Sequence, residues 1–201
     1  QRISSVKEEL GGEQAFQDFL DSNSFDLPYF RKYEREQLII DKHRELVLSG
    51  IEISDDEARD YYSQNNENLI EVKASHILLG TEEDALRVVQ RLQNGEDFAQ
   101  VAMLESLDSE SAVRGGDLGY FSRGYYSISE FEEKAFSLEE GEVSGVVKTE
   151  VGYHIIWVQD RMDTYEELAD KVIETIREEK YFQYIEELRA EAEVKKFTEY
   201  P

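Results

Sequence analysis

The sequence predicts an α+β fold, in which a small domain with a four-stranded, antiparallel-rich sheet and surrounding helices is inserted in a discontinuous all-helical domain. Two observations predict it. Apolar residues recur at helical spacing before residue 70 and again after residue 162, whereas between these segments they alternate as in strands. We therefore expect residues 71–161 to form the inserted domain, and residues 1–70 and 162–201 to form the helical one.

The amino-terminal segment carries helix boundaries. Pro28 suits the first turn of a helix, and Gly50 suits the end of the same helix. The sequence Ser54-Asp-Asp-Glu57 has the capping-box pattern that begins a further helix. The polar run Asn65-Asn-Glu-Asn68 is predicted to be the linker to the inserted domain.

The inserted segment shows strand patterns separated by helix signals. The predicted strands are 72–79, 120–121, 143–148 and 151–158. The last two strands form a predicted hairpin. Capping patterns at Thr81-Glu-Glu-Asp84 and Ser129-Glu-Phe-Glu132 predict helices between the strands.

The carboxy-terminal segment predicts one long amphipathic helix. It opens with the capping box Thr164-Tyr-Glu-Glu167, and apolar residues recur at helical spacing from Leu168 to Ala192. Its apolar face needs a partner, and the amino-terminal helices supply one in the simplest arrangement. Exchange of this helix between two copies would give a homodimer through the terminal helices. A short strand is expected at 194–197.

Composition limits the class of partner. A net charge of -24 and a pI near 4.4 argue against binding to nucleic acid, because such a surface repels phosphates. Cationic or neutral polypeptides are more compatible with this negative charge than nucleic acids are. No apolar run approaches the about 20 residues that span a bilayer. Because the chain starts at Gln1 without an initiator Met or a signal-like stretch, a processed or shortened chain is expected. No cysteine is present, which excludes thiol chemistry.

Two histidines carry the functional information. His76 and His154 each lie in an apolar strand pattern, and Gly-Gly-Asp-Leu-Gly, 115–119, lies between them. A single strand histidine is more often a satisfied core residue than a catalytic one. His43 lacks metal-ligand spacing to the other two, so no metal is expected. The glycine loop lacks the Lys and the helix of a nucleotide site, and no Gly-x-Ser-x-Gly turn indicates a hydrolase.

Five motifs resemble, in sequence and order, those of the parvulin peptidyl-prolyl isomerases over residues 72–160. They are Ala74-Ser-His-Ile-Leu78, Gly115-Gly-Asp-Leu-Gly119, Phe121-Ser-Arg-Gly124, Phe131-Glu-Glu-Lys-Ala-Phe136 and Gly152-Tyr-His-Ile-Ile156. The flanks resemble the helical chaperone portion of the bacterial SurA and PrsA proteins, at Ile53-Ser-Asp-Asp-Glu57, Tyr61-Tyr62 and Leu188-Arg189.

The resemblance implies a parvulin-like fold and particular site residues. The implied catalytic network is His76, Asp108, Thr149 and His154, and the implied walls of a proline pocket are Leu118, Tyr126 and Phe131. No cofactor is implied. The sequence departs from the family at Tyr125-Tyr-Ser-Ile-Ser129, which is one residue longer than the common spacing, and at Glu150-Val151. Each of these residues also has a plainer interpretation: Asp108 as a capping residue, Phe131 as core, and Thr149 as part of the hairpin turn.

The implied function is peptidyl-prolyl cis-trans isomerisation combined with folding of unfolded or secreted polypeptides. The loop after Leu79 reads Gly-Thr-Glu-Glu-Asp84 and lacks the basic residues of phosphate-directed members, so no phosphoserine preference is expected. The alternative is a chaperone or peptide-binding module whose parvulin domain is catalytically weak or inactive. The family resemblance also implies the bacterial periplasm or another extracytoplasmic location.

Overall fold

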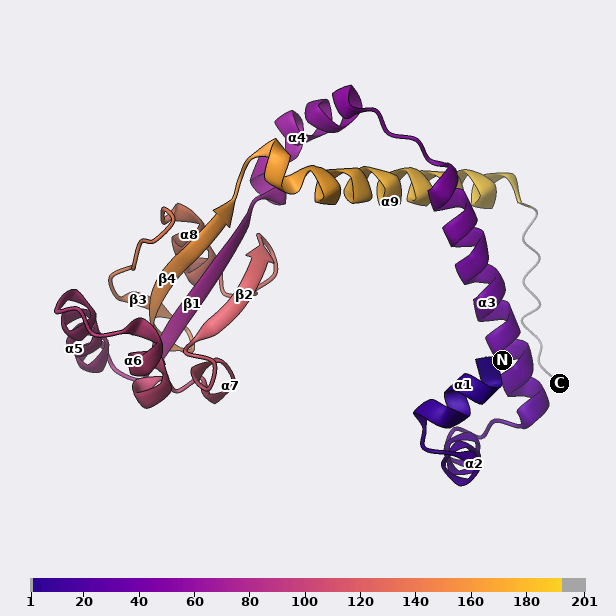
Figure 1. Ribbon diagram of the computed structural model, residues 1–201, viewed down its shortest axis with the longest axis horizontal. Coiled ribbons are helices and arrows are strands. Elements are labelled where there is room, and N and C mark those ends of the chain that lie inside the picture. Colours follow the sequence, from indigo (N-terminus) through magenta and orange to yellow (C-terminus); the bar gives the residue numbers. More distant parts are fainter. Residues whose placement is uncertain (1, 193–201) are drawn as a thin grey trace. The chain divides into compact units, whose positions relative to one another are not determined.

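The computed structural model describes residues 2–192 and divides by contacts into two units (Figure 1). One unit joins the residues up to Ile53 with those from Arg177 on, and the other is Ser54–Ile176. A discontinuous helical unit with an inserted sheet-containing unit is thus confirmed. The boundaries of the two units, after Ile53 and after Ile176, lie inside the flanking segments predicted at 1–70 and 162–201. The strand predicted at 194–197 lies outside the described residues.

The helical unit contains α1 (Arg2–Glu9), α2 (Glu13–Ser22), α3 (Leu27–Gly50) and the last part of α9 (Tyr165–Glu191). Its small core is Phe16, Leu20 and Phe30, with the two phenylalanine ring centres 5.3 Å apart. Asp26 caps α3 by accepting the Tyr29 N–H, and the helix ends at Gly50 as predicted.

The inserted unit holds one four-stranded sheet in the order β2-β1-β4-β3, with every neighbouring pair antiparallel. The strands are β1 (Glu71–Leu79), β2 (Asp117–Ser122), β3 (Val147–Thr149) and β4 (Gly152–Met162). The helices are α4 (Asp55–Leu69), α5 (Glu82–Gln93), α6 (Phe98–Glu105), α7 (Ser109–Ala112), α8 (Ser129–Ser137) and the first part of α9. The predicted hairpin is present, but its first strand is shorter than the predicted 143–148. Continuous pairing with β4 starts at Val147, and Val143 makes only an isolated bridge to Trp157.

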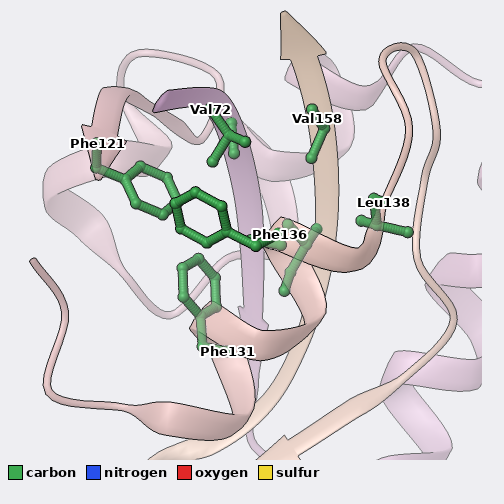
Figure 2. Packing of buried hydrophobic residues seen from close by; sticks show 9 residues of the cluster. Val72, Phe121, Phe131, Phe136, Leu138 and Val158 are labelled. Carbon is green, nitrogen blue, oxygen red and sulfur yellow. The ribbon is translucent and has the colours of Figure 1, made fainter. Parts of the chain in front are cut away.

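Each face of the sheet has its own apolar core. Figure 2 shows the core under α8, where Phe131 and Phe136 pack with Val72, Phe121 and Val158. The core on α5 and α6 uses the alternate residues of the same strands: Ile77, Leu79 and Ile155. Alternation therefore places the even-numbered residues of β1 and β4, and with them both histidines, on the α8 face.

Three predicted capping sites are confirmed, because Ser54, Thr81 and Thr164 each accept the backbone N–H three residues further on. The cap predicted at Ser129 is wrong: the N-cap of α8 is Ile128, and no side chain caps the helix.

The linker predicted at 65–68 is also wrong, since α4 continues to Leu69. Leu69 is buried, and its packing keeps this polar run helical against its weak intrinsic preference.

Candidate functional site

His76 and His154 come from the two central strands and meet on the α8 face of the sheet. His76 is paired with Ile156 in the register, and His154 with Leu78, so the two imidazoles are diagonal neighbours. Their rings are stacked with centres 5.4 Å apart, and the two Nδ1 atoms are 3.1 Å apart. Both side chains are buried, with 7% of His76 and 2% of His154 exposed.

Asp108 and Thr149 extend this pair at its two ends. Asp108 lies just before α7, where its carboxylate is 2.8 Å from His76 Nε2 and also accepts the Ser111 hydroxyl. Thr149 ends β3, and its hydroxyl oxygen is 2.9 Å from His154 Nε2. The resulting network runs from Thr149 through His154 and His76 to Asp108, as the resemblance implied.

The pKa values of Asp108 and His154 show which of these two groups is charged at neutral pH. Burial raises the pKa of Asp108, but hydrogen bonds from Ser111 and His76 outweigh that effect and lower the pKa to about 2. Burial, reinforced by the neighbouring His76, lowers the pKa of His154 to about 4. At neutral pH the network therefore contains a carboxylate and a neutral His154.

The hydrogen bonds of the network hold both imidazole rings in place. The Asp108 carboxylate only accepts, so His76 donates from Nε2. A neutral His154 carries one N–H, so one of its ring nitrogens donates and the other accepts, between His76 Nδ1 and the Thr149 hydroxyl. The Thr149 hydroxyl also lies 3.3 Å from the Gly152 carbonyl oxygen, to which it can donate. A chain of this kind fixes the orientation of both rings.

An open cavity of about 390 Å³ lies over the two imidazoles. The Phe131 ring contacts both histidines, with centre distances of 5.7 Å to His76 and 5.4 Å to His154, and the Tyr126 ring lies 5.4 Å from Phe131. The cavity is lined by His76, Leu78, Leu107, Asp108, Leu118, Tyr126, Ile128, Phe131, Val151 and His154.

All seven residues implied by the resemblance are thus brought together: six line the cavity, and Thr149 reaches it through His154. Four further residues line the cavity: Leu78, Leu107, Ile128, and Val151, which lies at one of the two departures from the family. Leu78 was predictable, because it shares a strand face with His76. Apolar residues in loops carry no comparable sequence signal.

Residues 2–192 contain neither a cluster suited to a metal ion nor a helix suited to a membrane. No group of three or more His, Cys, Asp or Glu side chains in this part of the chain is placed to hold a metal ion. His43 instead stacks on Tyr184, with ring centres 6.0 Å apart. No described helix is both long and apolar enough to cross a bilayer.

Comparison with known proteins decides the family. The family described as the PPIC-type PPIASE domain matches residues 61–162. The chain belongs to this family. The match reaches from α4 to the end of β4 and so includes every residue of the network and the cavity. The PPIC-type domain therefore coincides with the sheet-containing core of the inserted unit.

The relatives of this PPIC-type chain include proteins named foldase PrsA. That of Halalkalibacterium halodurans is 39% identical over 188 residues, covering 90% of this chain and 55% of the relative. That of Caldanaerobacter subterraneus is 44% identical over 122 residues, covering 61% of this chain and 40% of the relative. The chain spans about half the length of these curated relatives.

Among solved structures, the peptidylprolyl isomerase PrsA of Bacillus anthracis is 27% identical with a TM-score of 0.47, covering 97% of this chain and 88% of that one.

The lowered pKa of His154 predicts a pH dependence of stability. In the unfolded chain the imidazole takes up a proton near pH 6.5, whereas in the PPIC-type domain it does so only near pH 4. Its contribution to the free energy of unfolding is complete above pH 6.5 and is lost as the pH falls towards 4. We expect the loss to be on the order of 3 kcal/mol.

Urea unfolding of the wild type and of His154→Gln at several pH values checks this. The abundant carboxylates titrate in both proteins, so the difference between the two curves isolates the imidazole. A difference that is constant between pH 7 and pH 4 would contradict the expectation.

Proposed function

We propose that the chain is a peptidyl-prolyl cis-trans isomerase that acts on unfolded or proline-containing polypeptides. The observation that carries the proposal is the apolar cavity bounded by Leu118, Tyr126 and Phe131 directly over a buried pair of hydrogen-bonded histidines. Such a cavity accepts an uncharged ring. Membership of the PPIC-type family supports the same function.

The proposed reaction is rotation about the X-Pro peptide bond, in which no covalent bond breaks. The barrier to rotation about a peptide bond is about 18–20 kcal/mol, and uncatalysed X-Pro exchange takes about 10–100 s. At the top of the barrier the amide is twisted and has lost its resonance and much of its carbonyl dipole. An apolar surrounding favours this state over the planar amide, which has the larger dipole. In the proposed mechanism Leu118, Tyr126 and Phe131 grip the proline ring.

The network beneath the cavity acts through geometry in this mechanism. His76 and His154 form its floor, and Asp108 and Thr149 orient the two rings from the two ends. Proton transfer to the substrate is not required. The four residues are proposed to hold the floor rigid while the amide rotates above it.

A protease-coupled assay with a proline tetrapeptide tests the proposal on the whole chain. We expect the cis fraction to be consumed faster than in the uncatalysed control, in proportion to protein concentration. Rates equal to the control would contradict the isomerase and leave the alternative, a peptide-binding module without turnover. Peptide binding without acceleration would support that alternative directly.

The proposed substrates carry no phosphate before the proline. Asp108 lines the cavity, the lining residues include neither Lys nor Arg, and Glu82, Glu83 and Asp84 follow β1. A phosphoserine dianion in the cavity would meet the Asp108 carboxylate, and none of the residues lining the cavity would offer it a cationic partner. We expect kcat/KM for a phosphoserine-proline peptide to be at least about fivefold below that of the serine-proline peptide, which corresponds to about 1 kcal/mol of repulsion.

Paired assays at low and at high salt measure this difference. Faster turnover of the phosphorylated peptide would contradict the proposed preference. Added salt is expected to narrow the gap, since the repulsion is electrostatic.

The helical unit is proposed to hold unfolded polypeptides. Its helix α3 leaves Ile39, Ile40 and Leu46 between 54% and 72% exposed, and Phe182 of α9 is 63% exposed. Exposed side chains of this kind can bind apolar stretches of a client. Suppression of aggregation of a denatured protein by the wild type, weakened in Ile39→Ser with Leu46→Ser, would support this role. Equal suppression by both proteins would contradict it.

Three finer proposals concern assembly, domains and location. A homodimer through the terminal helices would cover the same exposed residues, and sedimentation of the wild type beside the double variant tests it. Residues 1–70 with 162–201 are proposed as the chaperone-like part, and residues 71–161 as the isomerase. An extracytoplasmic, bacterial setting is proposed from the PrsA-named relatives, and fractionation of the source cells tests it.

A further inference from the structure

Glu132 is a buried acid that the network does not use. It lies in the first turn of α8 with 9% of its surface exposed, whereas its neighbour Glu133 is exposed. A buried carboxylate is unfavourable unless hydrogen bonds compensate its lost hydration. Here both oxygens are compensated by one loop: Oε2 accepts the Gly124 N–H at 2.9 Å, and Oε1 accepts the Tyr126 N–H at 2.8 Å.

The loop that Glu132 holds carries a wall of the cavity. It joins β2 to α8 and turns at Gly124, where φ is +83°. Two residues later, the Tyr126 ring packs edge-on against Phe121 at 4.9 Å and against Phe131 at 5.4 Å. With the amides on either side of Tyr125 fixed, the backbone under the Tyr126 ring has little freedom. No capping side chain holds this end of α8, so Glu132 supplies the local constraint.

We propose that Glu132 is a positioning residue that sets the Tyr126 wall of the proline pocket, and thereby the affinity for substrate. The inference rests on the proposed isomerase function. Only a carboxylate serves both amides, because Gln offers one acceptor oxygen and turns an NH₂ group towards the second N–H donor.

The predicted change is in KM. An apolar wall contacts the proline ring equally before and during rotation, so losing its position removes uniform binding and leaves the chemical step little altered. In the whole chain we expect Glu132→Gln to raise KM for a proline tetrapeptide about threefold to tenfold, with kcat within about twofold of the wild type. The matched control is Glu133→Gln, which removes an exposed charge from the adjacent position and should change neither constant.

Amide hydrogen exchange provides a reading that is independent of turnover. In Glu132→Gln the Gly124 and Tyr126 amides should exchange at least about tenfold faster, whereas amides of the β1–β4 pair, such as Ile156, should stay as in the wild type. Glu132→Asp keeps both acceptor oxygens on a shorter side chain, so an intermediate KM is expected, and this variant replaces Glu132→Gln if the latter does not fold.

The possible outcomes distinguish a failure of the Glu132 inference from a failure of the proposed isomerase function. A wild type without isomerase activity would contradict the proposed function, and the exchange data would still decide whether Glu132 holds the loop. Wild-type activity with an unchanged KM in Glu132→Gln would overturn the inference alone. A fall in kcat with uniformly faster exchange over the whole sheet would also overturn it, because that pattern indicates general destabilisation.

Discussion

His154→Ala is expected to lower kcat/KM by about tenfold to a hundredfold, equivalent to about 1.4–2.8 kcal/mol of transition-state stabilisation. The substitution removes the central member of the network. It leaves His76 Nδ1 without its partner and opens a void under the cavity, whereas the Thr149 hydroxyl keeps its hydrogen bonds to Gly152 and Val151. The proposed floor beneath the rotating amide then has no single geometry. Leaving buried polar groups unsatisfied should also lower the free energy of unfolding by about 1–3 kcal/mol.

The protease-coupled assay on the whole chain measures this effect. His43→Ala is the matched control, since it also deletes an imidazole but lies on α3 in the helical unit. Circular dichroism at the assay temperature establishes that both variants are folded. Equal activity of His154→Ala and the wild type would show that the histidine pair is only part of the core, which is the plainer interpretation of the same residues.

Gly116→Ala is expected to lower the free energy of unfolding more than His154→Ala does. Gly116 has φ of +85°, and an added Cβ would lie 2.3 Å from the His76 carbonyl oxygen and 3.2 Å from Cβ of Ala102. Its own carbonyl accepts the His76 N–H at 2.9 Å, so neither backbone can move without breaking that bond. The clash adds to the backbone strain, and we expect the free energy of unfolding to fall by more than about 3 kcal/mol.

Gly119→Ala is the control that separates the cost of the left-handed backbone from the cost of the steric clash. Gly119 has a similar φ of +71°, yet nothing lies within 4 Å of an added Cβ. Its expected cost is only about 1 kcal/mol, from the left-handed backbone alone. Urea denaturation of both variants measures the difference. Similar losses in the two proteins would mean that the close approach to His76 relaxes at little cost.

Local sequence patterns predicted most of the elements. The strand pattern at 72–79 implies that Val72, Ala74 and His76 share a face, and three of the predicted caps begin helices where expected. The linker predicted at 65–68 failed because local polarity ignores tertiary packing: buried Leu69 keeps α4 helical to its end. The cap predicted at Ser129 failed for a related reason, since Glu132 bonds to the preceding loop.

The sequence by itself determined the α+β class, the inserted order of the two units and the pair of histidines, because periodicity and motif order are local properties of the chain. Only the tertiary structure decided which distant side chains meet. The 2.8 Å contact of Asp108 with His76 and the assembly of Leu107 and Val151 into the cavity depend on strand register and loop path. These are set by packing among residues far apart in the chain, which no single stretch of sequence specifies.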